Sequence, residues 1–220
     1  MTYAHAFHLV LRSIVIHPSR ALAALAGAVA LTITGMSPAS AAHWSHDDAV
    51  GDVQSQTDTF NEETGEENMG EPTGAPDNTD TDVIRVGVSH RTQRVVLKTT
   101  LRDVTVNSGV VIYDIRTGNR RYSVLQRLGT DRMFPAFHIS RGNGDRVRCT
   151  GVERSVDRAV NRATVSIPRR CVGSPGWVRV GVGAAKLNAT ETSFTALLDD
   201  AMQDAVVRDE LALSPRVVRG

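Results

Sequence analysis

The stretch that decides the fold class of this chain is residues 83–102, VIRVGVSHRTQRVVLKTTLR. Apolar or β-branched residues recur at every second position of two runs, namely at Ile84, Val86, Val88, Val95, Leu97, Thr99 and Leu101. Most of the residues beside them are cationic or small, namely Arg85, Gly87, Arg94, Lys98 and Arg102. Successive side chains of a strand point to opposite faces of a sheet, so this period of two indicates two half-buried antiparallel strands with basic outer faces.

The same alternation recurs at residues 111–115, 122–128, 163–167 and 178–182. Gly118-Asn119 separates the first two of these runs and predicts a tight hairpin turn. Residues 133–140 read as a further strand, which Pro135 places toward a sheet edge because proline cannot donate to a ladder. About seven short strands joined by turns are typical of an all-β, two-sheet antiparallel sandwich of the immunoglobulin-like or jelly-roll kind. The helical spacing of apolar residues at 196–211 predicts a short C-terminal helix.

Residues 1–41 have the pattern of an export signal. Arg12 and Arg20 form its basic region, residues 21–33 (ALAALAGAVALTI) form its apolar region, and Ala39-Ser40-Ala41 is its small-residue cleavage site. The apolar run is shorter than the roughly 18 to 20 residues that span a membrane, and no other stretch of that length follows. We therefore expect cleavage near Ala41 and a secreted, extracellular mature protein with no transmembrane segment.

Charge divides the mature chain into two parts. Residues 42–82 contain twelve Asp and Glu and no Lys or Arg, whereas residues 83–186 contain twenty Lys and Arg against six Asp and Glu. Residues 54–80 are also poor in large apolar side chains, which is typical of a mobile acidic loop. We therefore expect an acidic N-terminal segment with one short strand and a mobile loop at 42–82, followed by a β-sandwich domain with a C-terminal tail at 83–220.

The chain has two cysteines, Cys149 and Cys171, and both lie in the part expected to be exported. An oxidising compartment allows such a pair to close, and two cysteines permit one connectivity. Neither cysteine belongs to a Cys-x-x-Cys motif, which argues against a metal site. The sequence therefore predicts a single Cys149–Cys171 disulfide.

Several short motifs together carry a resemblance to known proteins. They are the export signal, Asp-Asp-x-x-Gly-Asp-Val at 47–53, the alternating Val/Arg strands, Pro-Arg-Arg-Cys at 168–171 and Trp-Val-Arg-Val at 177–180. In this combination the chain resembles uncharacterised exported β-sandwich proteins of actinobacteria, a resemblance that implies a fold and no known activity. The Asp-x-x-Gly-Asp-Val part also resembles the segment before the first strand of some carbohydrate-binding jelly-roll modules.

The sequence contains no catalytic signature, and we expect no enzyme. None of His43, His46, His90 and His138 belongs to His-Glu-x-x-His, and no serine lies in Gly-x-Ser-x-Gly. A copper-dependent or hydrolytic secreted enzyme remains as a remote alternative. Cleavage after Ala42 would make His43 the N-terminal residue, whose amine and imidazole could bind copper together with His90 or His138, as in oxidative polysaccharide-cleaving enzymes.

The leading functional prediction is binding of a polyanion through an arginine-rich sheet face. Arginine recognises phosphate and carboxylate groups in a bidentate geometry, and an exported protein meets such groups on cell-wall polymers, acidic polysaccharides and lipid headgroups. The predicted contact residues are Arg94, Lys98, Arg102, Arg179 and Trp177. The alternative interpretation of the same charges is that they keep the protein soluble.

The leading functional prediction includes no cofactor, and calcium is the one candidate that the sequence suggests. Aspartates flank turns and the beginnings of strands at the candidate ligand positions Asp47, Asp48, Asp52, Asp80, Asp82, Asp199 and Asp200. If the chain segments meet at one edge of the sandwich, these carboxylates could supply the six or more oxygens that Ca²⁺ prefers. The second functional prediction is therefore a calcium-stabilised carbohydrate-binding module in which Trp177 stacks on the sugar. The alternative is that the aspartates are exposed turn residues.

Overall fold

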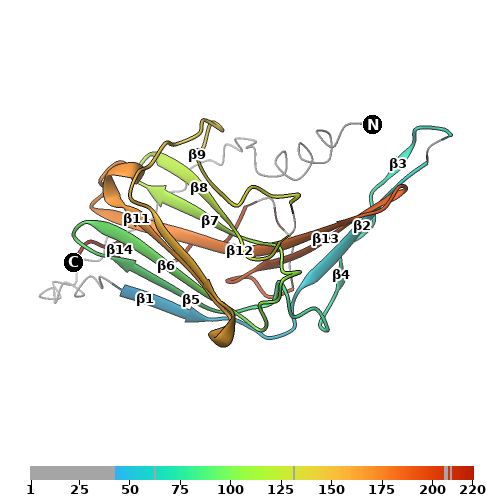
Figure 1. Ribbon diagram of the computed structural model, residues 1–220, viewed down its shortest axis with the longest axis horizontal. Helices are drawn as coiled ribbons and strands as arrows, with labels where there is room; N and C mark the ends of the chain where they lie inside the picture. Colours follow the sequence, from blue (N-terminus) through green and yellow to red (C-terminus); the bar gives the residue numbers. More distant parts are fainter. Residues whose placement is uncertain (1–42, 62, 131, 206–207, 209) are drawn as a thin grey trace, which may run out of the picture. The chain divides into compact units, whose positions relative to one another are not determined.

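Strands whose sequences alternate between apolar and polar residues pair into two sheets in the computed structural model (Figure 1). The structure describes residues 43–61, 63–130, 132–205, 208 and 210–220. The export signal predicted at residues 1–41 lies outside the described residues. No helix in the described ranges is both long and apolar enough to cross a membrane.

The first sheet has five strands in the order β1-β5-β6-β11-β10 (Figure 1). Their bounds are β1 His43–Asp47, β5 Val83–His90, β6 Arg94–Leu101, β10 Glu153–Asp157 and β11 Arg162–Pro168. The two strands predicted from residues 83–102 are thus confirmed as β5 and β6, which pair with Val88 opposite Leu97. A short 3₁₀ helix, η1 (Arg158–Val160), connects β10 to β11.

The second sheet has nine strands, seven of them in the order β3-β2-β13-β12-β7-β8-β9. Their bounds are β2 Gln54–Phe60, β3 Glu67–Asn68, β7 Val110–Thr117, β8 Arg120–Arg127, β9 Phe137–Arg141, β12 Trp177–Ala189 and β13 Ser193–Asp200. Two short strands complete it, since β4 (Thr73–Gly74) pairs with β2 and β14 (Val217–Val218) pairs with β12. A second 3₁₀ helix, η2 (Arg169–Val172), connects β11 to β12.

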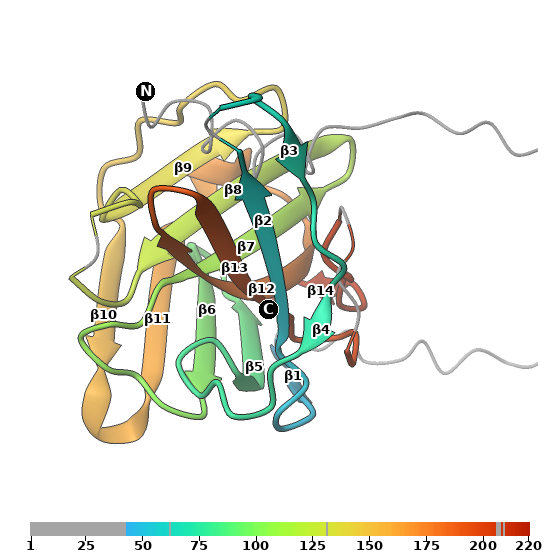
Figure 2. The same ribbon diagram turned by 90° about the vertical axis from the view of Figure 1, so that its right-hand side faces the viewer.

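The core is the layer of side chains between the two sheets, and Figure 2 shows the backbone of the strands that form these sheets. Fully buried members come from both sheets, namely Val86, Val88, Leu97 and Val165 from the first and Tyr113, Ile115, Val180 and Val182 from the second. A buried hydrogen bond also crosses this layer, because the Thr99 hydroxyl donates to the Tyr113 hydroxyl over 3.1 Å. The predicted two-sheet antiparallel sandwich is confirmed.

Local sequence signals placed the hairpin and the edge strand correctly. β7 and β8 pair up to Thr117 opposite Arg120, and Gly118 in the turn has a φ of +60°, a conformation that glycine adopts without strain. The strand predicted at 133–140 is confirmed as β9, which begins after Pro135 and ends the sheet path. Pro135 therefore lies just before the strand, at a position where the ladder does not require a backbone N–H donor.

Two sequence predictions are wrong. The mobile loop predicted at 54–80 contains β2, which pairs with β13, and β1 belongs to the first sheet, so the acidic segment is part of the sandwich. The C-terminal helix predicted at 196–211 is absent from the described residues, because its first part is strand β13, paired with β12 on one side and β2 on the other. β2 and β13 each contain both polar and apolar residues, and only their pairing with distant strands decides that they are extended.

The disulfide prediction is confirmed. Cys149 is bonded to Cys171, with their Cα atoms 5.7 Å apart. The bond joins the segment between β9 and β10 to η2. It therefore fixes an irregular stretch of chain against a short helical turn of the body.

Replacing both cysteines by serine (Cys149→Ser with Cys171→Ser) should lower the free energy of unfolding by about 3 kcal/mol. The unfolded chain regains the entropy of an open loop, because the two cysteines are separated by 22 positions. Urea denaturation followed by tryptophan fluorescence measures the effect as a lower midpoint. An unchanged midpoint would show that the disulfide does not constrain the unfolded chain.

His90 gives the sandwich a pH dependence of known sign. Its ring is fully buried, and Nδ1 lies 3.0 Å from the Val217 carbonyl oxygen of β14, an acceptor for an Nδ1 proton. Burial lowers the pKa of His90 below its usual 6.5, so the unfolded chain binds a proton that the folded chain does not. The folded state therefore loses stability as the pH falls from about 6.5 toward the lowered pKa.

The free energy of unfolding should accordingly fall more steeply between about pH 7 and pH 5 in the wild type than in His90→Gln. The glutamine amide keeps a donor toward Val217 and has no proton to gain in this range. Urea midpoints measured for both proteins at each pH give the comparison. Titrating groups other than His90 contribute equally to both proteins, so their effects cancel when the two pH dependences are compared. If the free energy of unfolding fell equally steeply with pH in both proteins, His90 would not be the group responsible.

Candidate functional site

Two of the three predicted cationic residues on or beside β6 serve the structure itself. The Arg94 guanidinium donates from Nε to the Ser166 hydroxyl at 2.6 Å and from Nη2 to the Ser166 carbonyl at 2.9 Å. Arg102 donates from Nη1 to the Pro76 carbonyl at 2.9 Å and pairs with Asp82. Lys98 is exposed and has no ion pair in the residues described. Of these three, only Lys98 is available on the outer face.

Arg179 and Trp177 lie on β12, in the other sheet. Arg179 donates from Nε to the Ser214 carbonyl at 2.8 Å and from Nη2 to the Leu213 carbonyl at 3.2 Å, which fastens the C-terminal segment. The Arg216 guanidinium carbon lies 4.4 Å from the centroid of the Trp177 ring. The structure therefore does not bring the five predicted ligand residues together, and Arg216 covers a face of the tryptophan.

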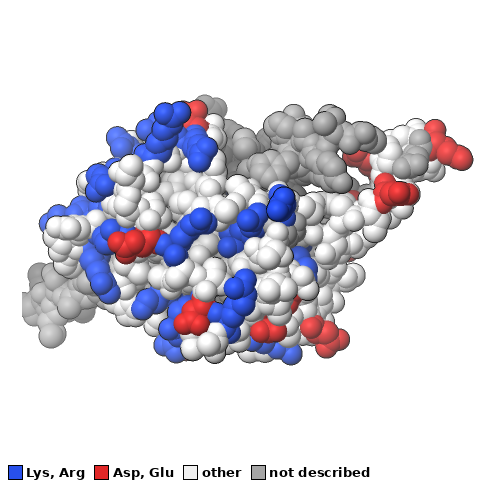
Figure 3. Space-filling model, viewed as in Figure 1, with Lys and Arg blue, Asp and Glu red and all other residues white. Residues whose placement is uncertain are grey.

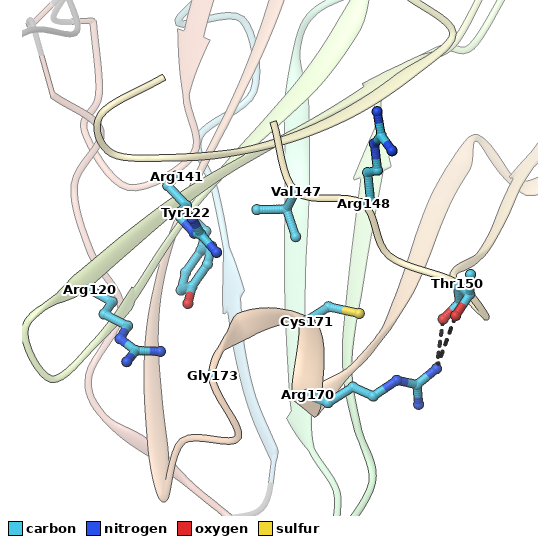
Figure 4. Close-up of a pocket in the computed structure, with 9 residues that line it drawn as sticks. All are labelled: Arg120, Tyr122, Arg141, Val147, Arg148, Thr150, Arg170, Cys171 and Gly173. Atoms are coloured by element: carbon cyan, nitrogen blue, oxygen red, sulfur yellow. Dashed lines mark hydrogen bonds between the residues drawn. The ribbon is translucent and has the colours of Figure 1, made fainter. Parts of the chain in front are cut away.

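A different group of arginines surrounds a pocket of about 320 Å³. Its lining residues come from the start of β8, the end of β9, the segment after β9, and η2: Arg120, Tyr122, Arg141, Val147, Arg148, Thr150, Arg170, Cys171 and Gly173. Figure 4 shows Arg120, Tyr122 and Arg141 on one side of the pocket and Arg148, Thr150 and Arg170 on the other. We call this group the arginine pocket.

The charge of the arginine pocket is uncompensated. Four guanidinium groups line it, and none of its lining residues in the part of the chain that the structure describes is acidic. Arg120, Arg141 and Arg148 are exposed and have no ion pair within the described ranges. Like charges at close range repel one another, so the pocket favours an anion that neutralises several of them.

A glycine, a hydrogen bond and the disulfide shape one side of the arginine pocket. Gly173 ends η2 with a φ of +80°, and a Cβ at this position would lie 2.9 Å from Arg120 Nη1 and 3.2 Å from the Tyr122 hydroxyl. Arg170 donates from Nη2 to the Thr150 carbonyl at 2.9 Å. This hydrogen bond and the Cys149–Cys171 disulfide join η2 to the segment after β9, so Arg148 and Arg170 stand on segments that are anchored to each other.

Surface charge is unevenly distributed on the face that Figure 3 shows. Lys and Arg side chains spread over the part that holds β5 to β11, with a few Asp and Glu side chains among them, whereas the end that holds β3 shows Asp and Glu side chains. The exposed outer face of the first sheet contributes Arg85, Lys98 and Arg162 to the basic part. The outer face of the first sheet is therefore basic, as strand phase predicts, whereas the arginine pocket lies on β8, β9, the segment after β9 and η2.

The predicted calcium ligands separate into two groups. Asp48, Asp52, Asp82 and Asp199 come together at the ends of strands, together with Asp204, which the sequence analysis did not identify. The others have different partners: Asp47 pairs with Arg85, Asp80 pairs with Lys186, and Asp200 accepts from the Ala212 amide and from Gln203. We call the five assembled residues the aspartate cluster.

Burial and mutual repulsion disfavour the charged form of the carboxylates in the aspartate cluster. Burial, reinforced by the Asp52 charge, raises the pKa of Asp48 to about 7. Burial also raises the pKa of Asp199 to about 8, with the charges of Asp48 and Asp52 adding to the effect. The pKa of Asp52 is raised by burial and by the neighbouring carboxylates. A cation or bound protons must therefore offset the negative charge at neutral pH.

The histidines of the copper hypothesis are dispersed. His43 lies on β1 with Nδ1 3.0 Å from the Ser89 hydroxyl, His90 is buried against Val217, and His138 lies on β9 in the other sheet. The candidate metal groups found among the described residues consist of aspartates and include no histidine.

Sequence reasoning missed the residues of the arginine pocket for a physical reason. Arg120, Arg141, Arg148 and Arg170 are far apart along the chain, and the disulfide together with the β8–β9 pairing brings them near one another. The one local signal was the density of arginines before Cys149, at positions 141, 146 and 148. Asp204 was missed because it fell in the predicted helix.

Comparisons with models of known protein families, with curated proteins and with solved structures find no match to this chain. The geometry of the two sites therefore provides the functional argument.

Replacing Arg102 by methionine should lower the free energy of unfolding by about 1 to 2 kcal/mol. The Asp82 side chain is fully buried, and the substitution removes its ion-pair partner and a hydrogen bond to Pro76. Arg85→Met is the matched control, because its partner Asp47 is 75% exposed and the loss should stay below about 0.5 kcal/mol. Urea midpoints distinguish the two variants, and equal losses would contradict the structural role of Arg102.

Proposed function

We propose that this chain is an exported, non-catalytic β-sandwich protein that binds an anionic polymer of the cell envelope or its surroundings through the arginine pocket. The observation that supports the proposal most directly is the gathering of four arginines around one pocket whose lining contains no acidic residue. The site replaces the contact set expected from the sequence, because Arg94, Arg102 and Arg179 have internal partners.

The chemistry of the pocket favours phosphate or carboxylate groups. A guanidinium group offers a planar pair of donors that matches both anions, and the Tyr122 and Thr150 hydroxyls add neutral donors at the same place. The pocket is open to solvent on one side, so one repeat of an extended chain can enter while neighbouring repeats follow the basic surface (Figure 3). An open pocket within a basic surface suits a polymer better than a small molecule, which usually binds in a cavity that encloses it.

The disulfide supports the exported location. Such bonds form and persist in oxidising compartments and are rare where thiols are kept reduced. Cys149–Cys171 stands beside the pocket and holds one of its walls, so the binding site itself depends on an oxidising environment. The pattern of an export signal at residues 1–41 agrees with this location.

No comparable observation favours sugar binding. Stacking on a pyranose ring requires an accessible aromatic face, and Arg216 lies over the Trp177 ring. The large hydrophobic residues exposed in the described ranges are Val50, Met69, Val106 and Val160, none of them aromatic. We therefore place polyanion binding ahead of the carbohydrate-binding alternative.

The double variant Arg141→Gln with Arg148→Gln tests the proposal. A fluorescently labelled inorganic polyphosphate serves as the probe, and anisotropy titrations at several salt concentrations give the Kd and its salt dependence. The variant should bind about tenfold more weakly, because each exposed charge-assisted contact contributes on the order of 0.5 to 1 kcal/mol. The slope of log K against log salt should fall by about two.

The matched control is Lys98→Gln with Arg162→Gln, which removes the same charge from the exposed outer face of the first sheet. Its Kd should change by about twofold or less. Equal weakening in both double variants would assign binding to the whole basic surface and contradict a role for the pocket. Absence of binding to polyphosphate and to a carboxylate polymer such as polyglutamate would overturn the proposed function.

A further inference from the structure

We propose that the aspartate cluster is a Ca²⁺ site built on Asp52, Asp82 and Asp199, with Asp48 and Asp204 beside it. This inference is independent of the proposed function, since it concerns other residues and another ligand. Proximity of acidic groups is not the only observation in favour of this site. Buried carboxylate oxygens of the cluster also have no hydrogen-bond partner among the described residues.

Five carboxylate oxygens in the cluster are buried and have no hydrogen-bond partner in the part of the chain that the structure describes. They are Asp48 Oδ2, Asp52 Oδ1, Asp52 Oδ2, Asp82 Oδ1 and Asp199 Oδ1. Two of the residues are nearly inaccessible, with Asp82 at 0% and Asp199 at 6% exposure. A buried carboxylate oxygen without a partner costs free energy, so several of them at one place favour a bound cation.

Within the aspartate cluster, two sets of three carboxylates each have the spacing of ligands around one ion, and the two sets share Asp52. One ligand oxygen from each of Asp52, Asp82 and Asp199 lies within 4.8 Å of the others, and the same holds for Asp48, Asp52 and Asp204. Calcium–oxygen bonds of about 2.4 Å place any two ligands of one ion at most about 4.8 Å apart. Asp52 belongs to both groups and has two free oxygens, so it can bridge them.

Backbone amides orient the ligands toward this point. The Gly51 amide donates to Asp82 Oδ2 at 2.8 Å, the Val83 amide donates to Asp199 Oδ2 at 2.6 Å, and the Ala49 amide donates to Asp48 Oδ1 at 3.0 Å. In each residue one oxygen is thereby anchored and the other is left for the cluster. Outer contacts of this kind fix the direction of metal-binding side chains.

Charge and donor type point to Ca²⁺. The five carboxylates have one ion-paired cation in the described residues, Arg102 at Asp82, so a divalent ion would neutralise charge that the protein leaves in excess. All donors are oxygens of carboxylates, which are hard ligands, and the cluster contains no histidine or cysteine that would favour zinc or copper. Ca²⁺ accepts irregular shells of six to eight oxygens, whereas Mg²⁺ requires a near-ideal octahedron.

The ion would join parts of the chain that belong to different sheets. Asp48 and Asp52 lie between β1 and β2, Asp82 directly precedes β5, and Asp199 is in β13. β1 and β5 are in the first sheet, while β2 and β13 are in the second. Binding should therefore stabilise the folded sandwich at the end where these strands meet.

Calorimetric titration of Ca²⁺ into chelator-treated protein near neutral pH tests the inference, together with thermal unfolding. We expect one saturable site with a Kd between about 1 µM and 1 mM, and an increase in Tm on the order of 5 to 10 °C at millimolar Ca²⁺. Mg²⁺ at the same concentration should give a smaller shift. Equal shifts with both ions, or no heat with Ca²⁺, would overturn the site.

Asp52→Asn retains the shape of the side chain and should weaken Ca²⁺ binding at least about a hundredfold. Its Tm in chelator should equal or exceed that of the wild type, because one repelling charge is lost, so the readout does not depend on instability. Asp204→Asn, at an exposed position, should weaken binding about tenfold and provides a second folded variant. Asp47→Asn is the matched control, since Asp47 neighbours Asp48 in sequence and pairs with Arg85 outside the cluster. If Asp47→Asn weakened Ca²⁺ binding as much as Asp52→Asn does, the assignment of the Ca²⁺ site to the aspartate cluster would be wrong.

Discussion

Burial of one face of each sheet against the other is the interaction on which the rest of this structure depends. Val88, Leu97 and Val180 lose all contact with water in that layer, and their neighbours along each strand must then point outward. The apolar layer thereby fixes the phase of every long strand. It also fixes the directions of Lys98 and Arg162 on the outer face, and it leaves only the strand ends and the connecting segments free to build sites.

The two sites use these free positions at opposite ends of β5. The aspartate cluster includes Asp82, which directly precedes the strand. The arginine pocket includes η2, whose Arg169 amide donates to the Gln93 carbonyl in the turn that follows β5. The residues of the two sites are therefore separate along the strand, and no residue belongs to both.

Strand prediction succeeded where one face of a strand is buried and failed where it is not. β5, β6, β7 and β8 contribute alternate residues to the core, so their sequences alternate. β2 is mostly polar on both faces and lies beside β13 and the short β3 and β4, and so its sequence contains little of that pattern. For the sites, the sequence identified four of the five clustered aspartates, since aspartate before a strand is a local signal. It identified no residue of the arginine pocket as a ligand, because those arginines meet only through the disulfide and the β8–β9 pairing.

The sequence by itself determined the all-β class, the hairpin at Gly118, the single disulfide and the separation of acidic from basic residues. Each of these depends on neighbouring residues or on the number of cysteines. Only the tertiary structure decided which arginines remain free, which aspartates meet, and that residues 193–200 form a strand and not a helix. Those outcomes depend on hydrogen bonds and charges between residues that are distant along the chain, from Arg102 and Asp82, 20 positions apart, to Val83 and Asp199, 116 positions apart. Such contacts leave no periodic trace in the chain.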